Sequence, residues 1–129
     1  IERDNGEGDA ARACAEGAAD KSACYPQPAR VKNIVLIDTA QTDADGTLRR
    51  IGQIDLLAIA DPEGRALPGT AREDGTLAFP FFTIENVDVV DANHIIVGND
   101  NNFPFSSSRQ PNMADDNEFI LLDVKDFLK

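Results

Sequence analysis

The sequence predicts an all-β fold, either a sandwich or a propeller, because short β-branched runs alternate with turn signals and long polar loops. Residues 31–39, "VKNIVLIDT", form the first such run. Apolar side chains alternate through residues 84–90 and 94–98, which predicts two strands joined by the turn residues between them. Residues 118–124, "EFILLDV", predict one more strand near the C-terminus.

The chain before and between these strands is expected to be mostly loop. Residues 4–30 are rich in Ala, Gly, Asp and Pro, which predicts a long loop excursion with one helical turn near residues 9–12. Asp45-Gly46 is a turn signal, so we expect residues 31–52 to form a β-hairpin.

Two other parts of the sequence are apolar but do not read as strands. Residues 56–60 do not alternate cleanly, and they are interpreted as a short helix or a turn. The stretch "FPF" occurs at residues 79–81 and again at 103–105. We expect both copies to fill hydrophobic space between propeller blades, in preference to forming an aromatic wall for a substrate.

Acidic residues dominate the charged side chains. Asp and Glu number 23 against 12 Lys and Arg, which gives a formal net charge of −11 and a pI of about 4.3. Such a surface repels nucleic acid and anionic lipid, and it suits either binding of divalent cations or simple solubility. No apolar run approaches the ~20 residues that a membrane span needs. Ile1 to Asp4 resemble the end of a strand already under way, so we expect a fragment of a longer protein or a processed piece.

Cys14 and Cys24 are the only cysteines, and nine residues separate them. No histidine lies near them in the sequence, which disfavours zinc, and their spacing is too long for a redox CxxC pair. We therefore predict a disulfide that closes a short Ala/Gly-rich loop, with two reduced, packed thiols as the alternative. A disulfide implies a periplasmic or secreted protein.

Four stretches resemble one known family. They are "ERDNGEGDAA", "FPFFTIENVDVVD", "VGNDNNFPFSSSR" and "DDNEFILLDV". Together they look like the esterase-like-activity-of-phytase family, over residues 1–12 and 31–124. Members of this family are bacterial, usually exported, considerably longer than this chain, and expected to be β-propellers. One departure is Ser108, which stands where the family usually has glycine.

The resemblance implies that residues 1–129 are the C-terminal portion of a β-propeller domain. This portion would hold about two to three blades' worth of short antiparallel strands with long polar loops. A closed ring needs at least about four blades. We therefore expect the missing N-terminal part of the same propeller, or another chain, as a partner.

The family name implies hydrolysis of a phosphoester or a related ester. We expect a divalent metal, Ca²⁺ above all, to polarise the substrate or activate a water. One rival is a non-enzymatic binding or scaffold module with at most a structural Ca²⁺. Another is a fragment that assembles with other chains through exposed strand edges. The expected ligand is a small anionic substrate, and neither nucleic acid nor a membrane is expected as a partner.

Polar residues just after a predicted strand are the candidate metal ligands. Asn99, Asp100 and Asn101 carry carboxylate and amide oxygens on short stems, and Ca²⁺ binds about six to eight such oxygens. Glu85, at the start of the paired strand, and Glu2, near the N-terminus, are the further candidates. The alternative is a turn capped by Asn and Asp side chains.

Two arginines are candidate ligands for an anionic substrate. Arg109 follows three serines whose hydroxyls and backbone amides can cradle phosphate oxygens, and Arg3 lies in the polar cluster near the N-terminus. In the alternative interpretation, Arg109 pairs with an acidic residue of 115–118 and fixes the loop. No catalytic residue is assigned, because there is no Gly-x-Ser-x-Gly elbow and the single histidine, His94, is interpreted as structural.

Overall fold

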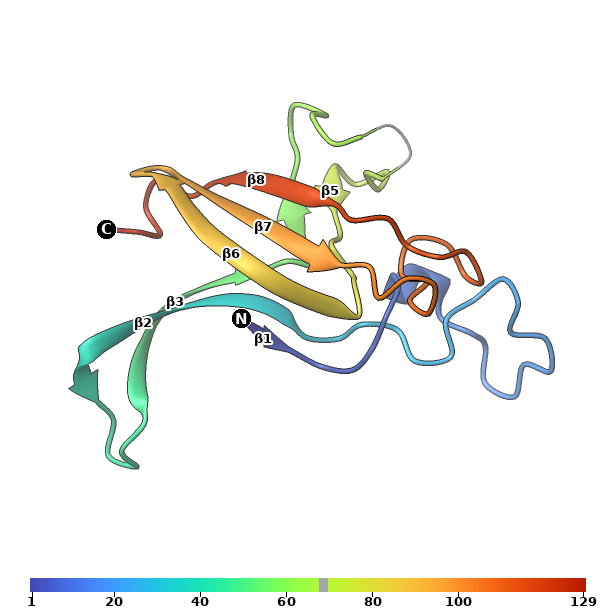
Figure 1. The fold of residues 1–129 in the computed structure, drawn as a ribbon, viewed down its shortest axis with the longest axis horizontal. Coiled ribbons are helices and arrows are strands. Elements are labelled where there is room, and N and C mark those ends of the chain that lie inside the picture. The colour runs from blue at the N-terminus through green and yellow to red at the C-terminus, as the bar shows by residue number, and fades with distance from the viewer. Residues whose placement is uncertain (68–69) are drawn as a thin grey trace.

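A computed structural model describes residues 1–67 and 70–129 (Figure 1). Within these residues the strands form three antiparallel sheets, in the orders β1-β2-β3, β4-β5 and β6-β7-β8. The all-β prediction is confirmed. None of these three sheets closes on itself, and the propeller arrangement stays a prediction. The elements are β1 (Glu2–Arg3), the 3₁₀ helix η1 (Ala10–Arg12), β2 (Lys32–Thr42), β3 (Leu48–Asp55), β4 (Ile59–Ala60), β5 (Thr76–Leu77), β6 (Thr83–Asp91), β7 (His94–Asp100) and β8 (Phe119–Asp123).

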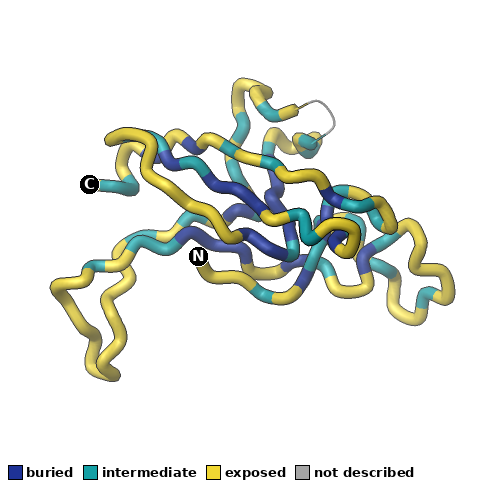
Figure 2. Tube along the Cα trace, viewed as in Figure 1, coloured by how far each residue is buried: buried dark blue, intermediate teal, exposed yellow. Residues whose placement is uncertain are grey.

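The predicted hairpin at 31–52 is confirmed as β2 and β3, which pair antiparallel. Its turn forms where Asp45-Gly46 predicted it, with the Gly46 amide donating to the Asp43 carbonyl at 2.9 Å. Gly46 has a φ of 87°, a conformation that glycine adopts without the clash a Cβ would cause. The hairpin projects from the rest of the molecule, and its tip is exposed (Figures 1 and 2).

The other predicted strands form the sheet β6-β7-β8. Val97 in the central strand pairs with Val87 on one side and with Ile120 on the other. Directly paired residues of antiparallel strands point to the same face of a sheet. Ile95 and Val97 of the central strand are buried on this face, which is why the apolar alternation predicted β7 correctly.

The hydrophobic core lies where this sheet meets β2 and the segment between β5 and β6 (Figure 2). Phe79 and Phe81 are almost fully buried there, with ring centroids 4.7 Å apart in an edge-to-face arrangement. The first "FPF" stretch therefore fills hydrophobic space as predicted, and its position between propeller blades stays a prediction. Core members are Ile34, Leu56, Phe79, Phe81, Ile84, Ile95, Val97, Leu122 and Val124.

The prediction for the second "FPF" stretch is wrong. Phe103 is 72% exposed and Phe105 is 85% exposed. The Phe105 amide donates to the Asn102 carbonyl at 2.8 Å, so these residues form a turn at a loop tip. A tight turn directs the two rings outward, whereas residues 79–81 run extended through the core.

Residues 4–31 form the predicted loop, with η1 as their regular element. Asp9 caps η1 by accepting a hydrogen bond from the Ala11 amide at 2.9 Å, which confirms the helical turn expected near residues 9–12. The predicted disulfide between Cys14 and Cys24 is present, with their Cα atoms 4.9 Å apart. Residues 56–58 form a turn and lead into β4. No helix within the described residues has the length and apolar character of a membrane span.

Candidate functional site

The polar residues after β7 use their side chains to build a turn and to hold the next strand. Asn99 is 3% exposed; its amide nitrogen donates to the Asp116 carbonyl at 3.1 Å, and its oxygen accepts from the Glu118 amide at 2.6 Å. Asp100 accepts from the Asn102 amide, and Asn101 accepts from the amide two residues further on. The capped-turn alternative describes these contacts.

The other two candidate metal ligands lie apart from this turn. Glu85 sits at an irregularity in the β6–β7 pairing and lines a shallow groove with Asp88 and Phe119. Glu2 in β1 pairs with Arg50 of β3 through both carboxylate oxygens. That pairing is the first cause that holds the pKa of Glu2 below its ordinary value. In the described part of the chain, no three His, Cys, Asp or Glu side chains are grouped as a metal site.

Both predicted anion-binding arginines bind protein groups. Arg109 forms a two-point ion pair with Glu118, at 2.7 and 2.6 Å, and also donates to the Ala78 carbonyl. The alternative interpretation, in which Arg109 fixes its own loop, matches this geometry. Arg3 donates to the Phe82 carbonyl at 3.1 Å and lies over the Phe82 ring.

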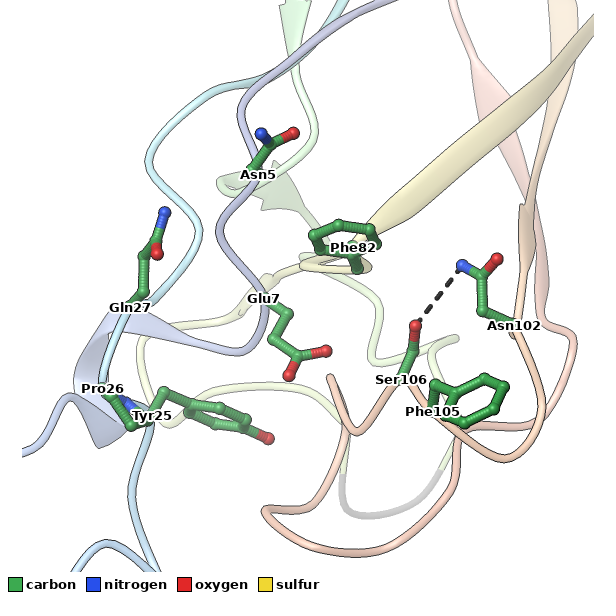
Figure 3. A pocket seen from close by; sticks show the side chains of 9 residues that line it. All are labelled: Asn5, Glu7, Tyr25, Pro26, Gln27, Phe82, Asn102, Phe105 and Ser106. Carbon is green, nitrogen blue, oxygen red and sulfur yellow. Dashed lines mark hydrogen bonds between the residues drawn. The ribbon is translucent and has the colours of Figure 1, made fainter.

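A cleft of about 520 Å³ lies between the N-terminal loop and the loop after β7 (Figure 3). Its polar groups include the Glu7 carboxylate and the Ser106 hydroxyl, which point into the same space in Figure 3. Aromatic rings supply much of the remaining wall. The lining residues are Asn5, Glu7, Tyr25, Pro26, Gln27, Phe82, Asn102, Phe105 and Ser106.

Long-range hydrogen bonds join the two walls of the cleft. Glu7 accepts from the Ser107 amide at 3.1 Å, and the Tyr25 hydroxyl donates to the Ser108 carbonyl at 2.7 Å. The Tyr25 ring packs on Gly8, where an added Cβ would lie 2.2 Å from a ring carbon. Glycine at position 8 is therefore required for the tyrosine to form this wall.

Asn102 and Ser106 form the wall contributed by the loop after β7. Asn102 has a φ of 45°, which asparagine tolerates better than most residues. Its amide nitrogen donates to the Thr83 hydroxyl and, at 3.4 Å, to the Ser106 hydroxyl oxygen. Ser106 is 5% exposed, and its hydroxyl hydrogen can turn toward a ligand in the cleft.

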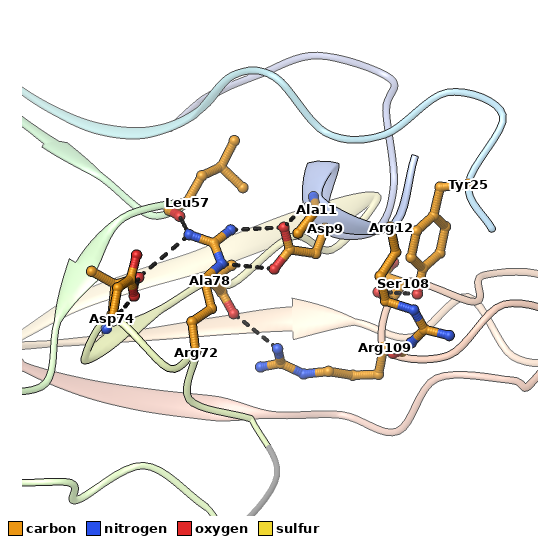
Figure 4. Close-up of polar contacts among 11 residues, drawn as sticks. Asp9, Ala11, Arg12, Tyr25, Leu57, Arg72, Asp74, Ala78, Ser108 and Arg109 are labelled. Carbon is orange, nitrogen blue, oxygen red and sulfur yellow. Dashed lines mark hydrogen bonds and ion pairs between the residues drawn. The ribbon is translucent and has the colours of Figure 1, made fainter. Parts of the chain in front are cut away.

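Two ion pairs, Arg72 with Asp9 and Arg109 with Glu118, hold these loops; Figure 4 shows the first pair and the hydrogen bond from Arg109 to the Ala78 carbonyl. Arg72, which precedes β5, donates to both carboxylate oxygens of Asp9 at 2.8 Å and to the Leu57 carbonyl. This pairing is the main cause that holds the pKa of Asp9 below its ordinary value. Arg109 and Glu118 fix the opposite loop, so an arginine anchors each side of the cleft.

The ionisable side chains of the lining give the cleft a negative charge. Burial raises the pKa of Tyr25 to about 12, so its phenol stays neutral and donates its hydrogen at neutral pH. Glu7 is then the lining residue that is charged. A carboxylate beside a hydroxyl, with apolar walls around them, can act as a general base toward a water or an alcohol.

Glu7 and Tyr25 are not among the site residues predicted from the sequence. Glu7 lies in the stretch "ERDNGEGDAA", which carried part of the family resemblance, and that was the one available signal. Ser106 belonged to the proposed anion-binding serines, and the structure places its hydroxyl in the cleft wall.

The family model described as "Phytase-like: Esterase-like activity of phytase" matches residues 1–103. The match includes the N-terminal wall of the cleft and Asn102, and it ends before Phe105 and Ser106. No curated protein and no solved structure matches the chain. Because the match spans 103 of 129 residues, the chain belongs to the phytase-like family, which is described by the esterase-like activity of phytase.

Proposed function

We propose that this chain is part of an exported hydrolase that cleaves a phosphoester or a related ester in the cleft between the N-terminal loop and the loop after β7. The observation that carries the proposal is the Glu7 carboxylate, which lies within the family-matched region and lines this cleft together with the Ser106 hydroxyl (Figure 3). The disulfide between Cys14 and Cys24 supports export to an oxidising compartment.

In this proposal Glu7 is the general base. One of its carboxylate oxygens accepts from the Ser107 amide, which fixes the side chain, and the other can take a proton from an attacking water. The Ser106 hydroxyl can donate to the oxygen on which negative charge develops. The Asn102 amide holds the Ser106 oxygen in place and acts as a positioning residue.

The divalent metal stays a separate proposal. The oxygens of Asn99 and Asn101 already accept backbone hydrogen bonds, and one oxygen of Asp100 does so too. No buried side-chain nitrogen or oxygen in the described residues lacks a hydrogen-bond partner. This donor set does not fit the shell of about six to eight oxygens that Ca²⁺ takes, so no step is assigned to a metal. If a cation does act here, chelation abolishes hydrolysis, Ca²⁺ restores it, and Asp100→Asn prevents the recovery.

A partner that completes the domain is proposed on a different observation. Val87 and Val89 are 41% and 59% exposed, although they point to the same face of the sheet as the buried Val97 and Ile95 with which they pair. Apolar side chains on the core-facing side of an edge strand favour coverage by a further strand, from the same propeller or from another chain. Val89→Lys should weaken such an association, measured by sedimentation of the chain with its candidate partner.

Glu7→Gln tests the proposed base. Glutamine keeps an oxygen that accepts from the Ser107 amide but cannot take a proton, so kcat/KM should fall about 100-fold or more while the thermal midpoint changes little. Glu16→Gln is the matched control, because Glu16 is an exposed residue of the same loop and does not line the cleft.

The readout is hydrolysis of 4-nitrophenyl acetate and 4-nitrophenyl phosphate by the purified chain and by both variants. Equal activity of wild type and Glu7→Gln on both compounds would remove Glu7 from the mechanism. A wild-type protein that binds ligand in the cleft but hydrolyses neither compound favours the non-enzymatic binding module.

A further inference from the structure

We propose that the ester group accepted by this cleft is uncharged, that is, a carboxylic ester in preference to a phosphate ester. The inference rests on the proposed function, because it assumes that the cleft holds the substrate, and it selects between the two classes of ester named there. Two observations support it: the charges of the residues that line the cleft, and the contacts that the neighbouring cationic side chains make.

The lining offers no positive charge to an anion. None of the nine lining residues is Lys, Arg or His, and the one ionised group among them is the Glu7 carboxylate. A phosphate monoester carries about two negative charges at neutral pH. Its approach would place these charges beside Glu7 in a chain whose formal net charge is −11.

Arg12 and Lys32 touch the lining residues Tyr25 and Phe82, but both bind other groups as well. Arg12 lies over the Tyr25 ring and donates to the Gln110 side chain at 2.9 Å. Lys32 is fully buried and pairs with Asp4 at 3.2 Å. Both side chains would have to break these contacts to reach a phosphate.

The two arginines predicted to bind an anion do not line the cleft. The charge of Arg109 is matched by Glu118. Arg3 donates a hydrogen bond to the Phe82 carbonyl.

The rest of the lining suits an uncharged ester. Tyr25, Phe82 and Phe105 present aromatic surface that can cover an acyl or alkyl group. The side chains of Asn5 and Gln27 lie on the same cleft and can donate hydrogen bonds to a neutral carbonyl oxygen (Figure 3). Neutral donors and apolar rings distinguish an ester by its shape and carbonyl, and they leave the charges of a phosphate unpaired.

Binding tests the inference separately from catalysis. Triacetin and glycerol 2-phosphate are both esters of glycerol, with three acetyl groups in the first and one phosphate group in the second, so they probe the two classes of ester. We expect the backbone amide resonance of Ser107, which donates to Glu7, to shift on titration with triacetin. Glycerol 2-phosphate should need at least about tenfold higher concentration for the same shift.

Gln27→Lys supplies the missing cation, and Gln27→Met is its uncharged control of similar length. Gln27 is exposed and lines the cleft, so the new ammonium group would lie at its surface. The lysine variant should bind glycerol 2-phosphate about tenfold more tightly than wild type, and added salt should reduce this gain. The methionine variant should show no such gain.

The outcomes separate this inference from the proposed function. Preference for triacetin without hydrolysis of any 4-nitrophenyl ester would support the ligand class and refute the hydrolase. Equal or tighter binding of glycerol 2-phosphate by wild type would overturn the inference, as would the absence of a Ser107 shift with either probe. Efficient wild-type hydrolysis of 4-nitrophenyl phosphate, inhibited competitively by inorganic phosphate, would also overturn it while leaving the hydrolase intact.

Discussion

Asp115 holds the loop that forms one wall of the cleft, and replacing it is the sharpest test of that role. Its side chain is 3% exposed and accepts two backbone hydrogen bonds, from the Ser108 amide at 2.7 Å and from the Arg109 amide at 2.9 Å. Its own amide donates to the Ser106 carbonyl at 2.9 Å. One buried carboxylate therefore sets the path of the chain from 106 to 109.

The expected cost of Asp115→Ala follows from these two bonds. A hydrogen bond to a charged group contributes about 1.5–3 kcal/mol, and a buried amide left without an acceptor adds a penalty of similar size. The Arg109 amide is only partly buried, so in the alanine variant a water molecule can accept its hydrogen bond in place of the carboxylate. We expect a loss of about 3–5 kcal/mol in the free energy of unfolding, a large share of the roughly 5–15 kcal/mol typical of a domain. Asp115→Asn keeps one acceptor oxygen and should lose about half as much.

Urea denaturation followed by circular dichroism measures this loss. With an m-value of about 2 kcal/mol/M, Asp115→Ala should lower the midpoint by roughly 2 M at unchanged m. Asp116→Ala is the matched control, because that side chain is exposed and only its backbone carbonyl is used, by Asn99. Equal midpoints for the two alanine variants would refute the anchoring role of the Asp115 carboxylate.

Three further predictions concern stability and titration. Tyr25 is the only tyrosine, so its ultraviolet titration should give a midpoint near the raised pKa of about 12, with stability falling as pH rises from about 10 through that value; a midpoint near 10 in folded protein would contradict this. Pairing with Arg72 lowers the pKa of Asp9, so the stabilisation that this pair contributes is complete above about pH 4 and is lost as pH falls below it. Arg72→Leu should therefore make the urea midpoint less dependent on pH in that range. An unchanged pH dependence would count against the pair. Replacing Cys14 and Cys24 with serine should lower the free energy of unfolding by about 3 kcal/mol, and an unchanged urea midpoint would refute that contribution.

The strands could be predicted because each is specified by its own residues. Ile95 and Val97 point to the buried face of β7, so alternation alone places them correctly. Asp45-Gly46 likewise encodes its turn locally. The two "FPF" stretches mark the limit of such reasoning. They have the same sequence, yet residues 79–81 are buried and residues 103–105 form an exposed turn, because their neighbours decide the path of the chain.

The candidate site was harder to predict because polar side chains in loops have several competing uses. Asn99 and Asp100 were predicted as metal ligands by type and spacing, and one side-chain oxygen of each accepts a hydrogen bond from a nearby backbone amide. Arg109 looked like an anion ligand, but Glu118, nine residues later, occupies its guanidinium. Residue type identifies the chemistry that a side chain can perform, whereas only the fold shows which partner reaches it first.

Glu7 has a structural contact as well as a proposed catalytic role: it accepts a hydrogen bond across the cleft from an amide 100 residues away, and it is also the proposed base. Activity lost on removing its side chain could therefore come from a displaced loop or from the missing base. Glu7→Gln keeps the acceptor for the Ser107 amide, whereas Glu7→Ala removes both acceptor and base. If Glu7 is the base, both variants lose activity to a similar extent and only the alanine variant is destabilised, by about 1–2 kcal/mol. If it only anchors the loop, the glutamine variant retains its activity, and kcat/KM measured beside the urea midpoint distinguishes the two roles.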